Sequence, residues 1–104
     1  MSAILSAAPV LRLKSGPYAG TVYELRATLR LGRHPYNEVS VADPTVSRYH
    51  CWVRHEDGRS WIEDLASANG TRVNGVRVLE RRALNPGDVI RAGNTELSFA
   101  EEGE

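Results

Sequence analysis

The sequence predicts an all-β fold, a sandwich built from many short strands. Apolar and polar residues alternate in short runs, such as residues 11–14 (LRLK) and 51–54 (CWVR). Such alternation turns one set of side chains toward a core and the other toward water. Nine glycines and five prolines also punctuate the chain at short intervals. Short strands separated by regularly spaced turn signals are typical of an all-β sandwich or barrel.

The expected strands follow these alternating runs in chain order. The runs cover residues 11–14, 29–31, 39–41, 51–54, 61–63, 76–78, 89–91 and 97–99. Gly, Pro, Asn and Asp stand between them, and these residues favour turns because of their backbone geometry or local hydrogen bonding. The turn signals fall at residues 16–17, 34–37, 43–44, 57–58, 69–70, 74–75, 86–88 and 93–94.

Two windows could instead be helical. Residues 21–31 contain no Gly or Pro and carry apolar residues at helical spacing, and residues 76–84 are similar. The first window, however, ends at a turn at Gly32, which suits a pair of strands better. We therefore expect both windows to be mostly extended.

Length, charge and cysteine content exclude several classes of protein. A chain of 104 residues is enough for one domain. Thirteen basic and thirteen acidic residues give a formal net charge of zero, which argues against a nonspecific nucleic-acid binder and against a polybasic membrane-surface protein. No apolar stretch approaches the roughly 20 residues of a membrane span. Because the single cysteine, Cys51, cannot form an intramolecular disulfide, we expect a reducing, cytoplasmic compartment. We also expect the chain to be a monomer.

Polar residues concentrate in segments between the expected strands, and their types suit a phosphate. The segments are residues 31–33 (LGR), 46–50 (VSRYH) and 67–75 (SANGTRVNG). Loops at the end of a sandwich are a common place for a binding site. A phosphate offers three strong acceptor oxygens and a charge of about −1.5 to −2 at neutral pH. Arg33 would supply forked charged donors and Ser47 a hydroxyl, while the amide of Asn69 could hold a peptide backbone.

These segments resemble the forkhead-associated (FHA) domain family, whose members bind phosphothreonine peptides. Each segment alone is weakly specific, but the three occur in the family's order and spacing. Residues 85–90 (NPGDVI) are also similar to the family's late strand-turn-strand. The resemblance runs from about residue 10 to residue 99, and leaves a short extension over residues 1–9 and an acidic tail over residues 100–104. It implies a sandwich of about eleven strands in two sheets, with the peptide bound across loop tips at one end.

The resemblance also implies roles for individual residues. Arg33 and Ser47 match the family's phosphate ligands, and Asn69 matches the residue that holds the peptide main chain. Arg48 adds a second positive charge beside Ser47, so we include it among the phosphate ligands. The residues expected to support the loops are Gly32, His50, Gly70, Thr71 and Asn74.

One residue departs from the pattern, and each assignment has a simpler structural alternative. Ala68 stands where some members carry a Ser or Thr that helps to hold the phosphate. A charge-assisted hydrogen bond is worth about 1.5–3 kcal/mol, so affinity would fall unless Arg48 or a backbone N–H compensates. Arg33 could be an ordinary surface arginine, Ser47 a turn or capping serine, and Asn69 part of a hairpin turn. An adjacent strand residue such as Arg48 could point away from Ser47.

Nothing in the sequence indicates a catalytic site, a metal site or a cofactor. His50 precedes Cys51, but neighbouring strand residues face opposite sides, so the two form a poor nucleophile–base pair. We expect His50 to be a buried, hydrogen-bonded brace of its loop and Cys51 to lie in the core. The three histidines lack the neighbouring carboxylate or thiol spacing of a metal site.

Two functions therefore remain from different classes. The leading hypothesis is a phosphothreonine-dependent peptide-binding module, not an enzyme, that docks a substrate of a Ser/Thr kinase or the kinase itself. The alternative is a phosphorylation-independent interaction or scaffold domain of the same fold. Its contact surface would be an exposed patch that includes Tyr18, Tyr23 or Tyr36.

Overall fold

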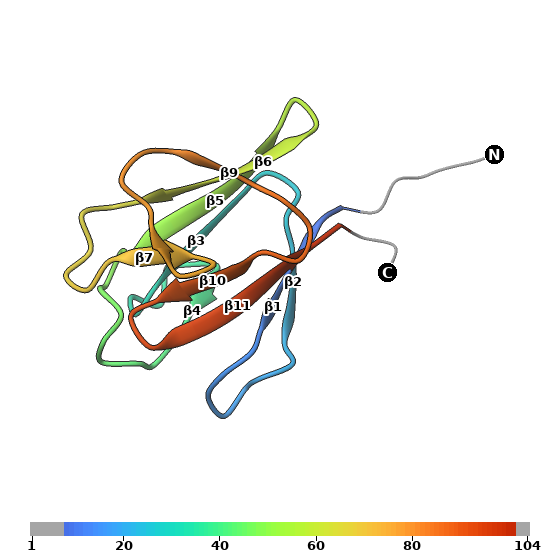
Figure 1. Cartoon of the computed structure of the whole chain (residues 1–104). Coiled ribbons are helices and arrows are strands. Elements are labelled where there is room, and N and C mark those ends of the chain that lie inside the picture. Colours follow the sequence, from blue (N-terminus) through green and yellow to red (C-terminus); the bar gives the residue numbers. More distant parts are fainter. Residues whose placement is uncertain (1–7, 102–104) are drawn as a thin grey trace.

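Two β-sheets packed face to face make up the described part of the chain, residues 8–101 of a computed structural model (Figure 1). The six-stranded sheet has the order β2-β1-β11-β10-β7-β8, and the five-stranded sheet has the order β4-β3-β5-β6-β9. The eleven strands are β1 Val10–Leu13, β2 Val22–Glu24, β3 Thr28–Gly32, β4 Val39–Ser40, β5 Cys51–Glu56, β6 Arg59–Asp64, β7 Thr71–Val73, β8 Val76–Arg77, β9 Arg82–Leu84, β10 Val89–Ala92 and β11 Thr95–Ala100. The predicted all-β sandwich of about eleven strands is confirmed.

The two windows with helical spacing are extended, as expected. Residues 21–31 contain β2 and most of β3, and residues 76–84 contain β8 and β9. Within residues 8–101 no helix has the length and apolar character needed to cross a membrane. Most of the extension expected over residues 1–9, and of the tail expected over residues 100–104, lies outside the described residues.

The core lies between the sheets, where the alternating residues of each strand meet. In β11 the inward residues Leu97 and Phe99 are 0% and 1% exposed, while the residues that alternate with them along the strand are half-buried. In β5 Cys51 and Val53 are buried, and the residues that alternate with them face outward. Burying a side chain of this size contributes roughly 1.5–3 kcal/mol, so the alternation that predicts the strands also drives the sheets together.

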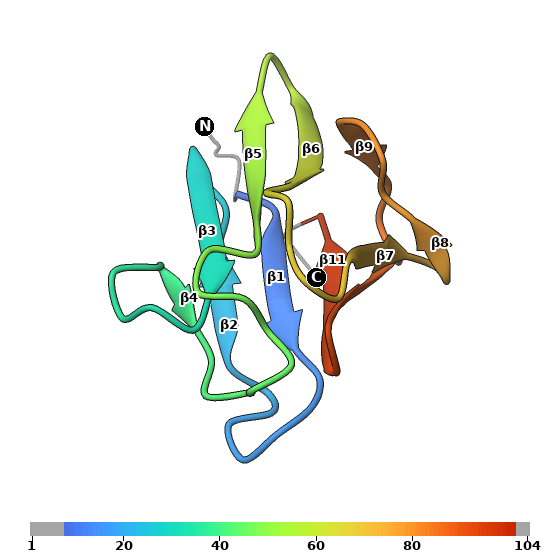
Figure 2. The same cartoon turned by 90° about the vertical axis from the view of Figure 1, so that its left-hand side faces the viewer.

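Three loops gather at the end of the sandwich that lies away from the two termini. In Figure 1 the β6–β7 loop (yellow) and the β4–β5 loop (green) lie at the left, whereas both termini lie at the right. Figure 2 turns this end toward the viewer and shows that the β3–β4 and β4–β5 loops also lie on it. All strand pairs are antiparallel except β3 and β4, which are parallel. This arrangement places the three polar segments of the sequence at one edge of the molecule.

Candidate functional site

Arg33 and Asn69 both reach the same short segment of the β4–β5 loop. The Arg33 backbone N–H donates to the carbonyl of Ser47 at 3.0 Å, and its side-chain Nε donates to the carbonyl of Val46 at 2.5 Å. The Asn69 side-chain Nδ2 donates to the carbonyl of Thr45 at 2.8 Å. The structure therefore brings together Arg33, Ser47 and Asn69, which come from three different loops.

Ser47 connects the β4–β5 loop to the β6–β7 loop. Its Oγ accepts a hydrogen bond from the backbone N–H of Ala68 at 2.9 Å. A hydroxyl that accepts one bond still has its own hydrogen to donate. The N–H of Ala68 is already engaged in this contact. It is therefore not free to donate to a phosphate in place of the side-chain hydroxyl that position 68 lacks.

His50 is the buried brace that the sequence predicts. Its side chain is 0% exposed. Its Nδ1 accepts the backbone N–H of Ser47 at 3.0 Å, which requires that the other nitrogen carry the hydrogen. That nitrogen, Nε2, lies 2.9 Å from the carbonyl of Gly70 and donates to it. One imidazole thus fixes the spacing between the two loops.

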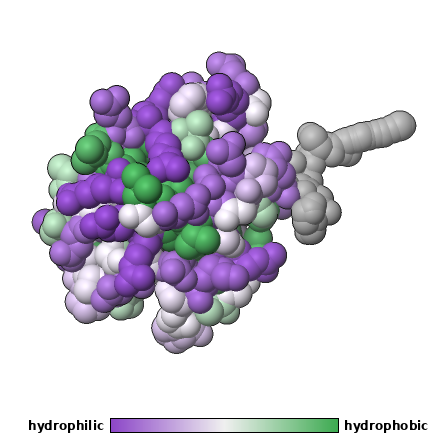
Figure 3. All heavy atoms as spheres, viewed as in Figure 1, coloured by the Kyte–Doolittle hydropathy of each residue, from purple (hydrophilic) through white to green (hydrophobic). Residues whose placement is uncertain are grey.

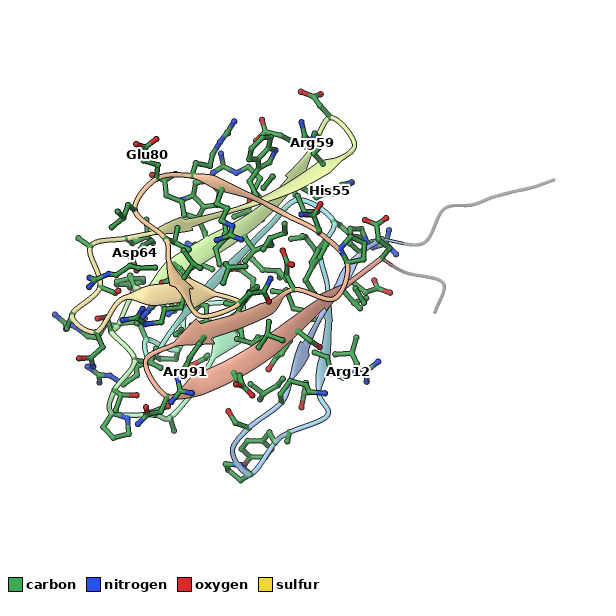
Figure 4. The ribbon with its side chains drawn as sticks, in the orientation of Figure 1. Arg12, His55, Arg59, Asp64, Glu80 and Arg91 are labelled. Carbon is green, nitrogen blue, oxygen red and sulfur yellow. The ribbon has the colours of Figure 1, made fainter. Side chains whose placement is uncertain are left out.

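The β6–β7 loop is held by the carboxylate of Asp64, which lies at its base (Figure 4). Ser67 donates from its Oγ at 2.5 Å and from its N–H at 3.1 Å, and Thr71 donates from Oγ1 at 2.6 Å. Partial burial raises the pKa of Asp64, but the hydrogen bonds from Ser67 and Thr71 outweigh it and leave the pKa lowered. Gly70 closes the loop at a φ of +85°, a conformation that favours glycine. Gly70 and Thr71 therefore both contribute to the shape of this loop.

Gly32 lets two loops approach closely. A Cβ at this position would lie 2.1 Å from the carbonyl oxygen of Arg48. The same carbonyl accepts Nδ2 of Asn37 at 2.8 Å, and that Nδ2 also donates to the carbonyl of His34 at 2.8 Å. Asn37 is 5% exposed. It is a loop-supporting residue that the sequence analysis treats only as a turn signal.

A second group that the sequence analysis missed surrounds Thr45. Asp43 Oδ1 accepts the N–H of Thr45 at 2.9 Å and its Oγ1 at 2.7 Å, which is a turn of the Asx kind. The bonds from Thr45 lower the pKa of Asp43. Thr45 Oγ1 accepts the N–H of Asn94 at 2.8 Å, and Asp43 Oδ2 accepts Oγ1 of Thr95 at 2.8 Å. The β10–β11 turn therefore belongs to the same cluster of loops.

The side chains of two other predicted residues lie apart from this network. The Arg48 side chain is exposed and, within residues 8–101, its guanidinium makes no hydrogen bond or salt bridge. Asn74 lies in the β7–β8 turn with a φ of +51°. Its amide donates to Asp88 Oδ1 at 2.9 Å and accepts the N–H of Val89 at 2.9 Å. Asn74 thus supports the six-stranded sheet and not the loops around Ser47.

Cys51 and His50 do not form a nucleophile–base pair in this structure. Burial raises the pKa of the Cys51 thiol to about 12, so the thiol stays protonated. Both ring nitrogens of His50 are engaged with backbone groups of the loops. The expectation that Cys51 lies in the core is confirmed by its exposure of 0%.

Comparison with known proteins gives the family. The sequence model described as the FHA domain matches residues 29–93. A solved structure from a study of phosphothreonine-dependent FHA domain interactions superimposes with a TM-score of 0.83 at 33% identity, and covers 93% of this chain and 99% of that one.

Two curated relatives are similar over most of the chain. The oxoglutarate dehydrogenase inhibitor of Corynebacterium diphtheriae is 39% identical over 95 residues, which are 90% of this chain and 66% of the relative. The glycogen accumulation regulator GarA of Mycolicibacterium smegmatis is 38% identical over 95 residues, 90% of this chain and 60% of the relative. The chain therefore spans about two thirds of the length of these relatives or less.

Proposed function

Because the chain belongs to the FHA domain family, we propose that it is a binding module that docks proteins phosphorylated on threonine. The observation that carries this proposal is the convergence of Arg33 and Asn69 on residues 45–47, the segment that presents the Ser47 hydroxyl. A guanidinium, a hydroxyl and an amide held by one rigid cluster of loops suit a phosphate and the peptide backbone beside it.

The hydrogen bonds within the site leave particular atoms for the ligand. Nε of Arg33 is occupied by Val46, so its two terminal nitrogens would form the forked contact with phosphate oxygens. The Ser47 hydroxyl would donate its free hydrogen to a phosphate oxygen and so form a third contact. Asn69 uses Nδ2 within the protein, so its Oδ1 would accept a peptide N–H. Arg48 would supply charge in place of the hydroxyl that Ala68 lacks.

The module would act by docking and not by chemistry, inside the cell where kinases phosphorylate proteins. Its partner would be a substrate of a Ser/Thr kinase or the kinase itself. The corynebacterial relative is named as an inhibitor of oxoglutarate dehydrogenase, and inhibition by docking on an enzyme is an effect that a binding module can have. Of the tyrosines in the alternative hypothesis, Tyr18 and Tyr36 are 75% and 77% exposed, whereas Tyr23 packs against the core.

Isothermal titration with a pool of phosphothreonine peptides tests the proposal, beside the phosphoserine and unphosphorylated pools. We expect saturable binding of the phosphothreonine pool alone. Arg33→Ala should weaken it by about 2–5 kcal/mol, because one partner of a charged pair is removed. Arg26→Ala is the matched control, since Arg26 is an exposed arginine that forms its salt bridge with Glu24, away from the site. Equal binding by Arg33→Ala and wild type would overturn the proposal, and binding unaffected by phosphatase would favour the scaffold alternative.

A further inference from the structure

Three arginines lie in register across the outer face of the six-stranded sheet. Arg72 in β7 is paired with Arg77 in β8 on one side and with Arg91 in β10 on the other. The residues that alternate with Arg72 and Arg91 along their strands are buried, so these arginines face the solvent. Neighbouring strands lie about 4.8 Å apart, so this arginine row, Arg72, Arg77 and Arg91, spans roughly 10 Å.

Both ends of the arginine row touch loops of the candidate site. The Arg77 guanidinium lies against Gly70, where a Cβ would be 3.0 Å from its Nε. Arg91 Nε donates to the carbonyl of Gly93 at 3.1 Å, and its Nη2 donates to Oδ1 of Asn94 at 3.2 Å. Figure 4 shows Arg91 toward the loop end of the sheet. The arginine row is therefore continuous with the site that would hold the phosphothreonine.

The charges of the arginine row are unpaired in the part of the chain that the structure describes. The salt bridges there involve Arg26, Arg30, Arg54 and Arg81. Glu96 is opposite Arg91 in β11 and makes no salt bridge with it. Like charges directly opposite each other in a sheet repel one another, so we expect the repulsion within the arginine row to oppose folding. Figure 3 shows the face of the molecule on which β10 and β11 lie, and most of that face is covered by hydrophilic side chains.

We propose that the arginine row is a second anion-binding surface, which receives a run of aspartate or glutamate residues next to the phosphothreonine of the same partner. The inference rests on the proposed function, because the phosphothreonine anchors the partner beside the row. Guanidinium groups match carboxylates in a forked geometry. About three residues of extended chain, at roughly 3.3 Å each, would cross the arginine row.

The continuity of the row with the loops favours this occupant over a nucleic acid or a membrane. A segment tethered at the phosphate site meets the row at a high effective concentration, so modest ion pairs add to affinity. A separate polyanion would have to bind three arginines unaided, on a protein whose formal net charge is zero.

The test uses two phosphothreonine peptides of equal length, one with Asp and Glu on both sides and one with Asn and Gln in their place. Fluorescence anisotropy would measure each against wild type at low salt and at about 0.5 M salt, where charges are screened beyond about 4 Å. We expect the acidic peptide to bind wild type about tenfold more tightly at low salt, as for two or three exposed ion pairs. This difference should shrink at high salt.

The double variant Arg72→Gln/Arg91→Gln should abolish the difference and leave the affinity for the neutral phosphopeptide unchanged. The double variant Arg12→Gln/Arg26→Gln removes the same charge from outside the row and should keep the difference. If the neutral and the acidic phosphopeptides bind wild type equally well, this inference is overturned and the proposed function still stands. Failure of every phosphopeptide would instead overturn the proposed function.

Two further probes separate the carboxylates from other anions. In one probe peptide a second phosphothreonine replaces the acidic run. If this peptide gains affinity through the arginine row and the acidic peptide does not, the assignment to carboxylates is overturned. Duplex DNA or phosphatidylserine vesicles bound by wild type, and not by Arg72→Gln/Arg91→Gln, would assign the row to another class of partner and also overturn it.

Discussion

The outer faces of the two sheets use arginine in opposite ways. On the outer face of the five-stranded sheet, and in the segment that leads into β9, arginines have aromatic and acidic partners. Arg54 lies 4.2 Å from the centre of the Trp52 ring, and Arg81 lies 4.3 Å from that of Trp61. Both also approach Glu56 at 3.9 Å. Guanidinium groups stacked on rings and close to a carboxylate stabilise this face.

On the six-stranded sheet the three arginines of the row form no salt bridge among the described residues. Arg72 Nη1 lies 3.5 Å from the carbonyl of Gly75, and Arg91 contacts Gly93 and Asn94. Their charges face the solvent beside the loops. The type of residue alone therefore does not decide its role, since an arginine side chain is structural where it is paired and available for a ligand where it is not.

The largest effect that would sharpen this comparison is expected from Trp61→Ala. Trp61 is half-buried, with Arg81 and Arg59 over its ring. Truncation of a fully buried Trp costs about 3–5 kcal/mol, so we expect urea denaturation to show a loss of about 2 kcal/mol here. Phosphopeptide affinity should not change, because this face lies apart from the loops. A loss of affinity without a loss of stability would contradict the structural role of this face.

A smaller loss of stability is expected from Arg54→Gln. It removes the cation from the face of Trp52 and the contact with Glu56. Exposed contacts of this kind are worth about 0.5–1 kcal/mol, and thermal unfolding would detect such a loss. Arg26→Gln, which touches no ring among the described residues, serves as the control. If the two variants unfold at the same temperature, the stacked arginine is not structural.

The opposite sign is expected from Arg72→Gln. It relieves repulsion from Arg77 and Arg91, which stand directly opposite in the sheet. We expect a gain of a few tenths of a kcal/mol, or about 1–3 °C in Tm. Calorimetry of Arg72→Gln and Arg54→Gln under the same conditions would measure the expected rise and the expected fall in Tm. A loss as large as that of Arg54→Gln would erase the distinction between the faces.

Local features of the sequence were sufficient to predict the fold, but not the brace of the site. Burial follows alternation, so the run that contains Leu97 and Phe99 identifies β11. The turn at Gly32 separates extended segments where a helix was the alternative. His50 was expected to be a buried brace from the resemblance to the FHA family, and because alternation along a strand makes it a poor partner for Cys51. The fold follows from neighbours in the chain, whereas the brace needed the resemblance as well.

What the sequence did not predict depends on pairing between distant segments. Strand β7, Thr71–Val73, lies inside a segment interpreted as a loop, because three residues are too few for a period to be distinguished. The bond between Thr45 and Asn94 joins two different loops, although Asp43 followed two residues later by Thr45 is a turn signal that could have drawn attention to it. The arginine row exists only in the register of β7 with β8 and β10.

The smallest effect on stability is expected from loss of the ion pair between Arg30 and Glu38. The pKa of Glu38 also reports directly whether this arginine is paired. The side-chain hydrogen bond from Arg30, at 2.9 Å, lowers the pKa of Glu38 to about 2. The unfolded value is about 4.3, so the ionised pair stabilises the fold above that pH, and the contribution is lost as the pH falls through about 2. Both side chains are well exposed, so the loss is small.

Carboxyl chemical shifts in an NMR titration would measure this pKa directly. In Arg30→Gln the midpoint for Glu38 should rise toward the ordinary range, because the cation that favours the carboxylate is gone. Arg72→Gln should leave it unchanged, since the arginine row lies on the other sheet. A wild-type midpoint near 4 would mean that Arg30 is no more paired in solution than Arg72, and would remove the contrast between the two faces at its clearest pair.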